Sequence, residues 1–340
     1  MNAPTLKDVA ARAGVSLSTA SSALNGLALV NVRTRMRVEA VAREMGYRKD
    51  ASAAVLATRQ RRSKAAGVRL TLGYLVSETA RHQVSEEFAE RAEEMGYDTE
   101  WVRLRAGESP AKASLALWNR SVAGLYYASP SAVPVEGDWV HEFDWSRFAV
   151  VKFTRSRPEL RFDLIRHSAF DYMARTVREV VARGYRRIGV LLGESTVGID
   201  DEARLGALLG WEALRKPRGL RVEWKSLCGA EWGSRPLGAD LHRWLAKFRP
   251  DAVIGFPEAV YWKLHEAGWR MPDDFGFASV ALTEDTDFIA GCPANYGTIV
   301  EKAVDLLDHK IKAGLLGMAD VPQETVIEPA WKAGSTLPGR

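Results

Sequence analysis

Hydrophobic and polar residues are arranged in two different ways along this 340-residue chain. Up to about residue 50, small apolar residues recur every three or four positions, which is the spacing of short helices. From residue 70 onward, short apolar runs of strand type alternate with amphipathic stretches. Such alternation predicts parallel sheets that are covered by helices on both faces. We therefore expect a small all-α head followed by a large α/β body.

The body contains six apolar runs that we predict to be buried strands. They are residues 70–76 (LTLGYLV), 122–128 (VAGLYYA), 147–153 (RFAVVKF), 186–193 (RRIGVLLG), 251–256 (DAVIGF) and 275–282 (FGFASVAL). Amphipathic helices are predicted between them, for example at 84–95, 170–183 and 237–247. The body is about 270 residues long, which is enough for two lobes of this kind.

The first segment contains the start and stop signals of three short helices. Thr5 opens a capping-box arrangement, and Gly14 can end the first helix because glycine tolerates a positive φ. Ser16 is the candidate N-cap of a second helix, and Asn31 is that of a third, which Gly46 would end. The first two helices are thus separated by only about three residues.

This tight connection has small residues, Ala10 and Ala20, where the two helices would cross, and the pattern predicts a helix-turn-helix unit. Residues 1–70 contain 13 Lys or Arg and 4 Asp or Glu, a local net charge of +9, whereas the remainder carries −5. Only Tyr47 of the 31 aromatic residues lies in this segment. A basic helical head of this kind predicts contact with a polyanion. A plain helical bundle or a solvated basic tail is the alternative interpretation.

The run TLKDVAARAGVSLSTASSALNG, followed by VNVRTRMRVEAVAREMGYRKDASAAVLA, resembles the DNA-binding head of the LacI/GalR (lactose-repressor) family. The match extends from residue 5 to about residue 60. It implies a homodimer whose second helices enter successive major grooves of a pseudo-palindromic operator in double-stranded DNA. It also implies a helix-turn-helix head at residues 1–49 and a hinge helix or linker at 50–69. The body at 70–340 would then be a periplasmic-binding-protein-like pair of lobes that binds an effector and dimerises.

The resemblance assigns DNA contacts residue by residue. Contacts from the start of the first helix fall to Thr5 and Leu6. Contacts to base edges fall to Leu17, Ser18 and Ser22. Contacts to phosphates fall to Ser16, Thr19, Ser21, Asn25 and Thr34. Contacts from the hinge fall to Ala53 and Leu56, with Leu56 placed in the minor groove. Many members have Arg where this chain has Ser22, and Arg is the side chain that pairs bidentately with guanine. We therefore expect an operator preference that differs from theirs.

Two lobes of this type imply a small-molecule effector, which is carbohydrate-like in many members of the family. The sugar-binding positions do not carry over to this chain, because the family's Asp is replaced by His167 and its Arg by Ala207. Its Asn-Asp pair is replaced by Pro257-Glu258. The residues we retain as candidate effector ligands are His167, Arg204, Trp211 and Glu258.

The sequence also argues against several classes of protein. It has no phosphate-binding or dinucleotide-binding glycine loop and no G-x-S-x-G elbow, so we predict neither an enzyme nor a cofactor. Cys228 and Cys292 are too few for a disulfide framework, and no His or Cys cluster has zinc spacing. No run approaches the ~18 apolar residues of a membrane span.

The first residues lack the pattern of a secretory signal, so we expect a cytoplasmic, nucleoid-associated protein and not a periplasmic ligand carrier. The predicted function is that of a sequence-specific DNA-binding transcriptional regulator, a repressor controlled by a small molecule. Loss of ligand control and activation remain as alternatives. The operator, the regulated genes, the effector and the choice between dimer and tetramer are not indicated by the sequence.

Overall fold

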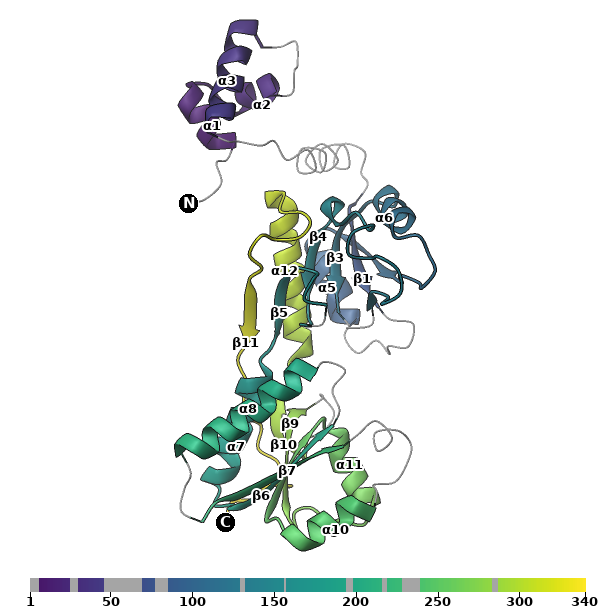
Figure 1. The fold of residues 1–340 in the computed structure, drawn as a ribbon, viewed down its shortest axis with the longest axis vertical. Coiled ribbons are helices and arrows are strands. Elements are labelled where there is room, and N and C mark those ends of the chain that lie inside the picture. Colours follow the sequence, from purple (N-terminus) through teal and green to yellow (C-terminus); the bar gives the residue numbers. More distant parts are fainter. Residues whose placement is uncertain are drawn as a thin grey trace.

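The computed structural model has a three-helix head and a body of two α/β lobes (Figure 1). The residues that the structure describes are 6–24, 30–45, 69–76, 85–128, 132–155, 157–193, 198–215, 219–227, 239–282 and 287–340. The domain boundaries predicted at residues 49 and 50 therefore fall outside the described part of the chain. No helix of the described residues is long and apolar enough to cross a membrane.

The head consists of α1 (Leu6–Ala13), α2 (Leu17–Leu24) and α3 (Val32–Glu44). Gly14 has φ +64°, which is the left-handed conformation expected of a residue that ends a helix. The Ser16 hydroxyl accepts a hydrogen bond from the Thr19 amide at 3.1 Å and caps α2. Asn31 caps α3 by accepting from the Arg33 amide at 2.9 Å. The predicted caps of the second and third helices are therefore confirmed.

The three helices enclose a core of small apolar side chains, which are Val9, Ala10, Ala13, Ala20, Ala23, Val30, Val38 and Ala42. Ala10 and Ala20 are 4% and 0% exposed, so α1 and α2 approach closely where the sequence predicted them to cross. Because this core contains few large side chains and the head is small, we expect its free energy of unfolding to be low. The geometry of the helix-turn-helix therefore depends on these short side chains.

The first lobe is a six-stranded sheet with strand order β11-β5-β4-β3-β1-β2, in which neighbouring strands run parallel. Its strands are β1 (Thr71–Leu75), β2 (Asp98–Val102), β3 (Val122–Tyr127), β4 (Ala149–Lys152), β5 (Asp163–His167) and β11 (Glu324–Ile327). Helices α5 (Ser85–Glu94) and α12 (Tyr296–Ala313) pack on one face. The other face is covered by α6 (Pro110–Asn119) and by the aromatic-rich segment 132–148, which contains the short 3-10 helix η2 (Trp145–Arg147).

The second lobe is a five-stranded parallel sheet with strand order β10-β9-β8-β6-β7. Its strands are β6 (Arg187–Gly193), β7 (Arg221–Leu227), β8 (Ala252–Phe256), β9 (Gly276–Leu282) and β10 (Ala290–Pro293). One face packs against α7 (Ala169–Ala182) and α8 (Gly198–Arg215), and the other against α10 (Ala239–Phe248) and α11 (Ala259–Glu266). The predicted fold class, parallel sheets with helices on both faces in a two-lobed body, is confirmed.

The chain passes between the lobes three times. It leaves the first lobe from β5 into α7, returns from β10 into α12, and leaves again after β11. The last passage ends on the second lobe, where Lys332 pairs with Gly291 in an isolated bridge and Leu337 joins the core. Because each passage begins or ends near the carboxyl ends of the strands, side chains from all three segments meet between the lobes.

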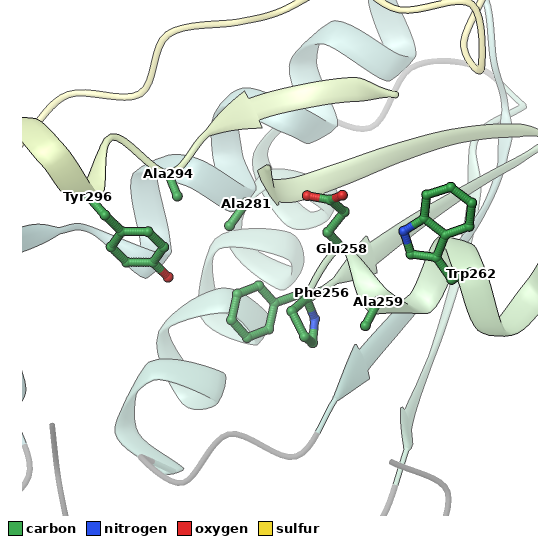
Figure 2. A pocket seen from close by; sticks show the side chains of 8 residues that line it. Phe256, Glu258, Ala259, Trp262, Ala281, Ala294 and Tyr296 are labelled. Atoms are coloured by element: carbon green, nitrogen blue, oxygen red, sulfur yellow. The ribbon is translucent and has the colours of Figure 1, made fainter. Parts of the chain in front are cut away.

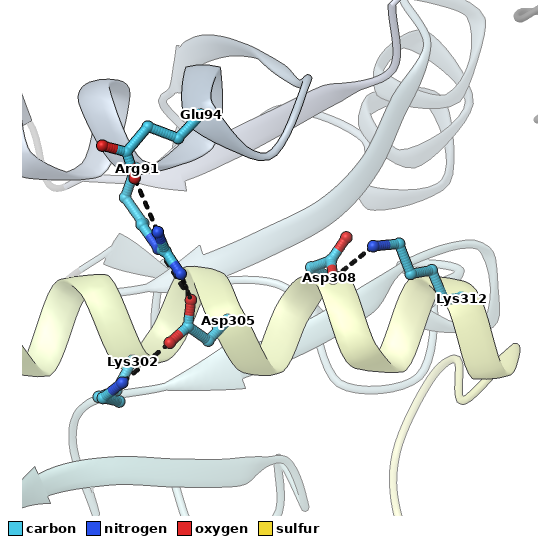
Figure 3. A network of polar contacts seen from close by, with 6 residues as sticks. All are labelled: Arg91, Glu94, Lys302, Asp305, Asp308 and Lys312. Carbon is cyan, nitrogen blue, oxygen red and sulfur yellow. Dashed lines mark hydrogen bonds and ion pairs between the residues drawn. The ribbon is translucent and has the colours of Figure 1, made fainter.

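Helix α12 is fastened along its length to the rest of the first lobe. Its Asp305 accepts two hydrogen bonds from Arg91 of α5, at 2.8 and 2.7 Å, and also pairs with Lys302 (Figure 3). Its Asp308 accepts from the hydroxyl of Tyr97 at 3.0 Å. Near the other end of the helix, Lys310 donates to Asp163 of β5 at 2.5 Å. These contacts hold α12 in a fixed position relative to both α5 and the sheet.

Candidate functional site

The amino-terminal end of α2 forms an exposed surface on the head. Leu17, which the sequence predicts to face DNA bases, is 53% exposed although it is a large apolar residue. Ser16 is exposed and Thr19 is half-buried, and their hydroxyls lie 2.8 Å apart. Thr34, another predicted phosphate ligand, is half-buried on α3. Short hydroxyl side chains at a helix N-terminus are suited to bind phosphate oxygens.

The other predicted DNA contacts cannot be placed as side chains. Thr5, Asn25, Ala53 and Leu56 lie outside the described residues. Leu6, Ser18, Ser21 and Ser22 belong to described helices, but the positions of their side chains lie outside the description. The structure therefore places Ser16, Leu17, Thr19 and Thr34, and the remaining assignments stay predictions.

A second candidate site is a cavity of about 300 Å³ beside the chain segment that passes from β10 of the second lobe to α12 of the first. Its lining residues are Phe256, Pro257, Glu258, Ala259, Trp262, Ala281, Ala294 and Tyr296 (Figure 2). They come from the end of β8, the first turn of α11, the end of β9 and the return passage into α12. A cavity of this volume matches a small-molecule site, because such sites typically start at about 300 Å³.

Glu258, one of the predicted effector ligands, is at the N-cap position of α11 and is 7% exposed. Its carboxylate lies above the ring of Phe256, between Ala281 and Trp262 (Figure 2). A negative charge at this end of a helix is favoured by the helix dipole. Glu258 is therefore a buried acidic group that belongs directly to the cavity.

Arg204 lies behind the cavity, on α8. It is 3% exposed, donates to Asp201 at 2.7 Å, and its guanidinium carbon lies 3.5 Å from the centre of the Phe256 ring. Burial lowers the pKa of Arg204, and the charges of Asp201 and Asp200 act in the opposite direction. Its buried Nε has no hydrogen-bond partner in the structure. Arg204 lies near the cavity but does not line it, and its role as an effector ligand stays a prediction.

His167, at the end of β5, lies in a group of aromatic rings. Its ring centre is 5.1 Å from that of Tyr172, 5.6 Å from that of Phe153 and 5.8 Å from that of Tyr296, the last of which lines the cavity. Burial, together with the nearby charges of Arg204 and Arg166, lowers the pKa of His167 to about 4. The imidazole is therefore neutral at pH 7.

Trp211 lies elsewhere. Its partly buried ring packs against the core of the second lobe and does not line the cavity. The aromatic residues that do line it are Phe256, Trp262 and Tyr296. Phe256 and Tyr296 have no local sequence signal that separates them from core residues, whereas Trp262 stands on the exposed face of α11, 44% exposed. Among the described residues, no three His, Cys, Asp or Glu side chains gather as metal ligands.

A group of ion pairs lies beside this site, and one of them connects the two lobes. Arg166 of β5 donates to Glu324 of β11 at 2.6 Å and also lies 3.5 Å from Asp200 of α8, on the other lobe. Arg155 donates to the same Glu324 at 2.6 Å. Burial raises the pKa of Glu324, but the hydrogen bonds and charges of Arg155 and Arg166 outweigh this effect and lower it. Asp200 and Arg204 are neighbours on α8, so the pairing between the lobes lies next to the candidate effector site.

The low pKa of His167 predicts a pH dependence of stability. The unfolded chain binds the proton more readily, so the contribution is complete above the ordinary pKa of 6.5 and is lost as the pH falls toward 4. The shift corresponds to about 2–3 kcal/mol, allowing for the partial exposure of the ring. In urea unfolding of the body at pH 7 and pH 5, His167→Phe should show a flatter pH dependence than the unchanged protein. His141→Phe, at an exposed histidine, should retain the full dependence, and equal slopes for all three proteins would contradict the assignment.

Comparisons with known proteins cover both parts of the chain. Residues 5–50 match the family of bacterial regulatory proteins called the lacI family. The HTH-type transcriptional regulator DegA of Bacillus subtilis (strain 168) is 21% identical over 291 residues, which cover 82% of this chain and 83% of that protein.

Two solved structures have the same fold over nearly the whole chain. The lac repressor dimer bound to operator and the anti-inducer ONPF has a TM-score of 0.57 at 18% identity, covering 99% of this chain and all of that one. The complex of the transcriptional regulator CelR with cellobiose has a TM-score of 0.56 at 19% identity, covering 98% of this chain and 99% of that one. The chain thus combines a head that matches the lacI family with a two-lobed body that has the fold of solved regulators, the organisation of a DNA-binding transcriptional regulator.

Proposed function

We propose that this protein is a homodimeric repressor that acts in the cytoplasm on nucleoid DNA. Its affinity for operator DNA rises or falls when a small molecule binds between the lobes. Dimerisation of the body sets the spacing of two heads, which occupy the two halves of a pseudo-palindromic operator. The hinge at residues 50–69, with Ala53 and Leu56, enters the minor groove between them. Occupation of promoter DNA by the pair then blocks transcription.

The observation that carries the DNA-binding part is the exposed apolar side chain of Leu17 at the N-terminus of α2. A leucine that is 53% exposed contributes little to folding, but it can contact a thymine methyl group in the major groove. The hydroxyls of Ser16 and Thr19 lie beside it and would set the register on the phosphates. The exposed basic side chains Arg33 and Arg37 on α3 add the charge that attracts DNA.

Control by a ligand is supported by the cavity and by its position. An effector changes DNA affinity only through different affinities for two conformations of the protein. The cavity combines side chains of the second lobe with Tyr296 at the start of α12, which is fastened to the first lobe. A molecule bound there contacts both lobes and therefore distinguishes an open arrangement from a closed one. This favours ligand control over its loss.

The test is selection of operator DNA by the full-length protein from a pool of randomised duplexes. We expect enrichment of a pseudo-palindrome with half-sites one helical turn apart. Leu17→Ala should lower affinity for the selected site about 5- to 30-fold, corresponding to about 1–2 kcal/mol, with little effect on random DNA. Leu209→Ala is the matched control, because Leu209 is a leucine of the body that is 48% exposed.

Two results of this selection would contradict the proposal. One is a pool without any enriched sequence, which would remove the claim of sequence-specific binding. The other is an equal loss of affinity for selected and random DNA in the Leu17→Ala protein, which would mean that Leu17 supports the fold of the head and does not read bases.

A further inference from the structure

Four charged side chains form the group of ion pairs beside the cavity, and they come from both lobes. Arg155, Arg166 and Glu324 belong to the first lobe. Asp200 belongs to α8 of the second lobe. Glu324 accepts from each arginine at 2.6 Å, with a different carboxylate oxygen for each. The three groups of the first lobe thus have two positive charges and one negative charge, and Asp200 supplies the second negative charge of the group.

Arg166 is held in position by the first lobe alone. Its Nε donates to Glu324 at 2.6 Å, and its Nη1 donates to the carbonyl oxygen of His167 at 3.0 Å. The same Nη1 lies 3.5 Å from the carboxylate of Asp200, which is longer than an ordinary hydrogen bond. Separation of the lobes would therefore break the contact with Asp200, while Arg166 would keep its two partners in the first lobe.

The contact between Arg166 and Asp200 is largely removed from water, since their side chains are 9% and 23% exposed. Opposite charges attract more strongly in such surroundings than on an open surface, where ion pairs contribute little. Without Asp200, the nearly buried guanidinium would belong to a group with an excess of positive charge, which is unfavourable. The pair therefore favours the arrangement of the lobes in which the two side chains meet.

Each side chain of this pair is close to the lining of the cavity. In the first lobe, the residue after the arginine is His167, and the centre of its ring lies 5.8 Å from that of Tyr296. In the second lobe, Arg204 follows the aspartate by one turn of α8, and its guanidinium lies against the ring of Phe256. Tyr296 and Phe256 both line the cavity, so a molecule that moves these rings would act on the pair from both lobes.

We propose that the Arg166–Asp200 pair is a latch that holds the two lobes in the arrangement of this structure, and that an effector acts by strengthening or breaking it. This inference rests on the proposed function, because it concerns the step between occupation of the cavity and the change in operator affinity. Control of this kind requires two arrangements of the lobes that differ little in free energy. Removal of the only charge that the second lobe contributes to the group of four should shift the balance between them even without a ligand.

The experiment changes Asp200 in three ways in the full-length protein. Asp200→Glu retains the charge, Asp200→Asn removes it and Asp200→Lys reverses it. Gel-shift titration with the selected operator measures affinity, and small-angle scattering measures the radius of gyration of the protein without DNA. We expect Asp200→Asn to change operator affinity at least about 5-fold, which is the lower end of typical coupling between two sites. Asp200→Lys should change it further in the same direction and increase the radius of gyration, whereas Asp200→Glu should retain most of the affinity.

Two further variants separate the pair from other roles of Asp200. Glu202→Gln removes an exposed negative charge from the same helix and should leave both measured quantities unchanged. The charge of Asp200 also acts on Arg204, and this effect does not require Arg166. In the background of Arg166→Leu, Asp200→Asn should therefore have little further effect on operator affinity if the two side chains act as a pair. An effect through Arg204 would persist in that background.

Three results would overturn the inference. They are a radius of gyration that Asp200→Lys leaves unchanged, equal operator affinities for Asp200→Glu and Asp200→Asn, and a full effect of Asp200→Asn in the Arg166→Leu background. Should Arg166→Leu not fold, the comparison of the three Asp200 variants decides alone. Failure of the unchanged protein to select an operator would contradict the proposed function. The radius of gyration would still test the latch in that case, so the two failures can be told apart.

Discussion

Replacing Asp163 with alanine is expected to destabilise the first lobe by about 3–5 kcal/mol. Asp163 accepts a hydrogen bond from Lys310 at 2.5 Å, and the lysine side chain is 5% exposed. Its other oxygen accepts from the amide of Gln323 at 2.9 Å, just before β11. Removal of the carboxylate leaves a buried ammonium without its partner and a backbone amide without its acceptor. Loss of one member of a buried pair has this magnitude because the remaining charge is uncompensated. Urea unfolding measures the change.

The control for this variant is Asp240→Ala. Asp240 pairs with Arg243 on the surface of α10, where both side chains are more than 70% exposed, and exposed pairs contribute about 1 kcal/mol or less. The double variant Asp163→Leu with Lys310→Met should recover much of the loss, since it removes both charges and fills the space. A change below 1 kcal/mol for Asp163→Ala alone would show that the pair does not stabilise the lobe.

Ala20→Leu is expected to abolish operator binding, with a loss of affinity of at least about 100-fold. Ala20 is fully buried where α2 crosses α1, next to a core made of alanines and valines. Three added carbons cannot fit without separating the helices, and overpacking of this kind costs about 1–3 kcal/mol or more. A head of this size has only a few kcal/mol of stability, so the helix-turn-helix is lost. Gel-shift titration with the selected operator measures the effect.

The matched control is Ala40→Leu, the same change at an exposed position of α3. It should leave operator affinity within a factor of about two, because substitutions on an open helix surface rarely alter stability by more than about 0.5 kcal/mol. The melting temperature of the body should be the same in both variants. Normal operator binding by Ala20→Leu would mean that the crossing of α1 and α2 tolerates a larger side chain and is not the element that fixes the head.

The head could be predicted almost completely because its signals are local. Gly14, Ser16 and Asn31 act on backbone groups within a few residues of themselves, so their effect can be read without knowing the rest of the fold. In the body, the six predicted strands correspond to β1, β3, β4, β6, β8 and β9, whose described side chains are almost entirely buried. Continuous burial produces the apolar runs that the prediction used.

The remaining strands lack this signature for a physical reason. Strands β2 and β7 are at the edges of their sheets and are mostly exposed, so their sequences, DTEWV and RVEWKSL, are largely polar. Strand β5 (DLIRH) has only two apolar residues, and strand β10 (AGCP) consists of small residues and proline, so neither forms a run of large apolar side chains. Strand β11 was indicated by the family resemblance of the C-terminal segment and not by its hydrophobicity. These strands depend more on main-chain pairing and on one or two buried side chains, such as Val102 and Leu227, than on a continuous apolar run.

The candidate effector site could be predicted only in part. His167 and Glu258 were selected because they occupy positions of the sugar-binding pattern, and Arg204 because it is an arginine close to the position that Ala207 occupies. The structure places all three near the segments that pass between the lobes. Trp211 was selected as an aromatic residue in the same region of sequence, but it packs into the second-lobe core. Tyr296 was missed because it reaches the cavity through the path of the chain, about 40 residues after Phe256 in sequence. Only the tertiary fold brings them together.

Helix α12 gives the molecule a rigid mechanical linkage. Its first residue, Tyr296, lines the cavity, and its 18 residues correspond to a rod of about 27 Å along the first lobe. Ion pairs to α5 and β5 prevent the rod from bending or sliding on its own. We therefore expect that a movement of Tyr296 on ligand binding would move α12 as a whole, together with α5 and β5. The distance over which such a movement is transmitted is set by the length of α12.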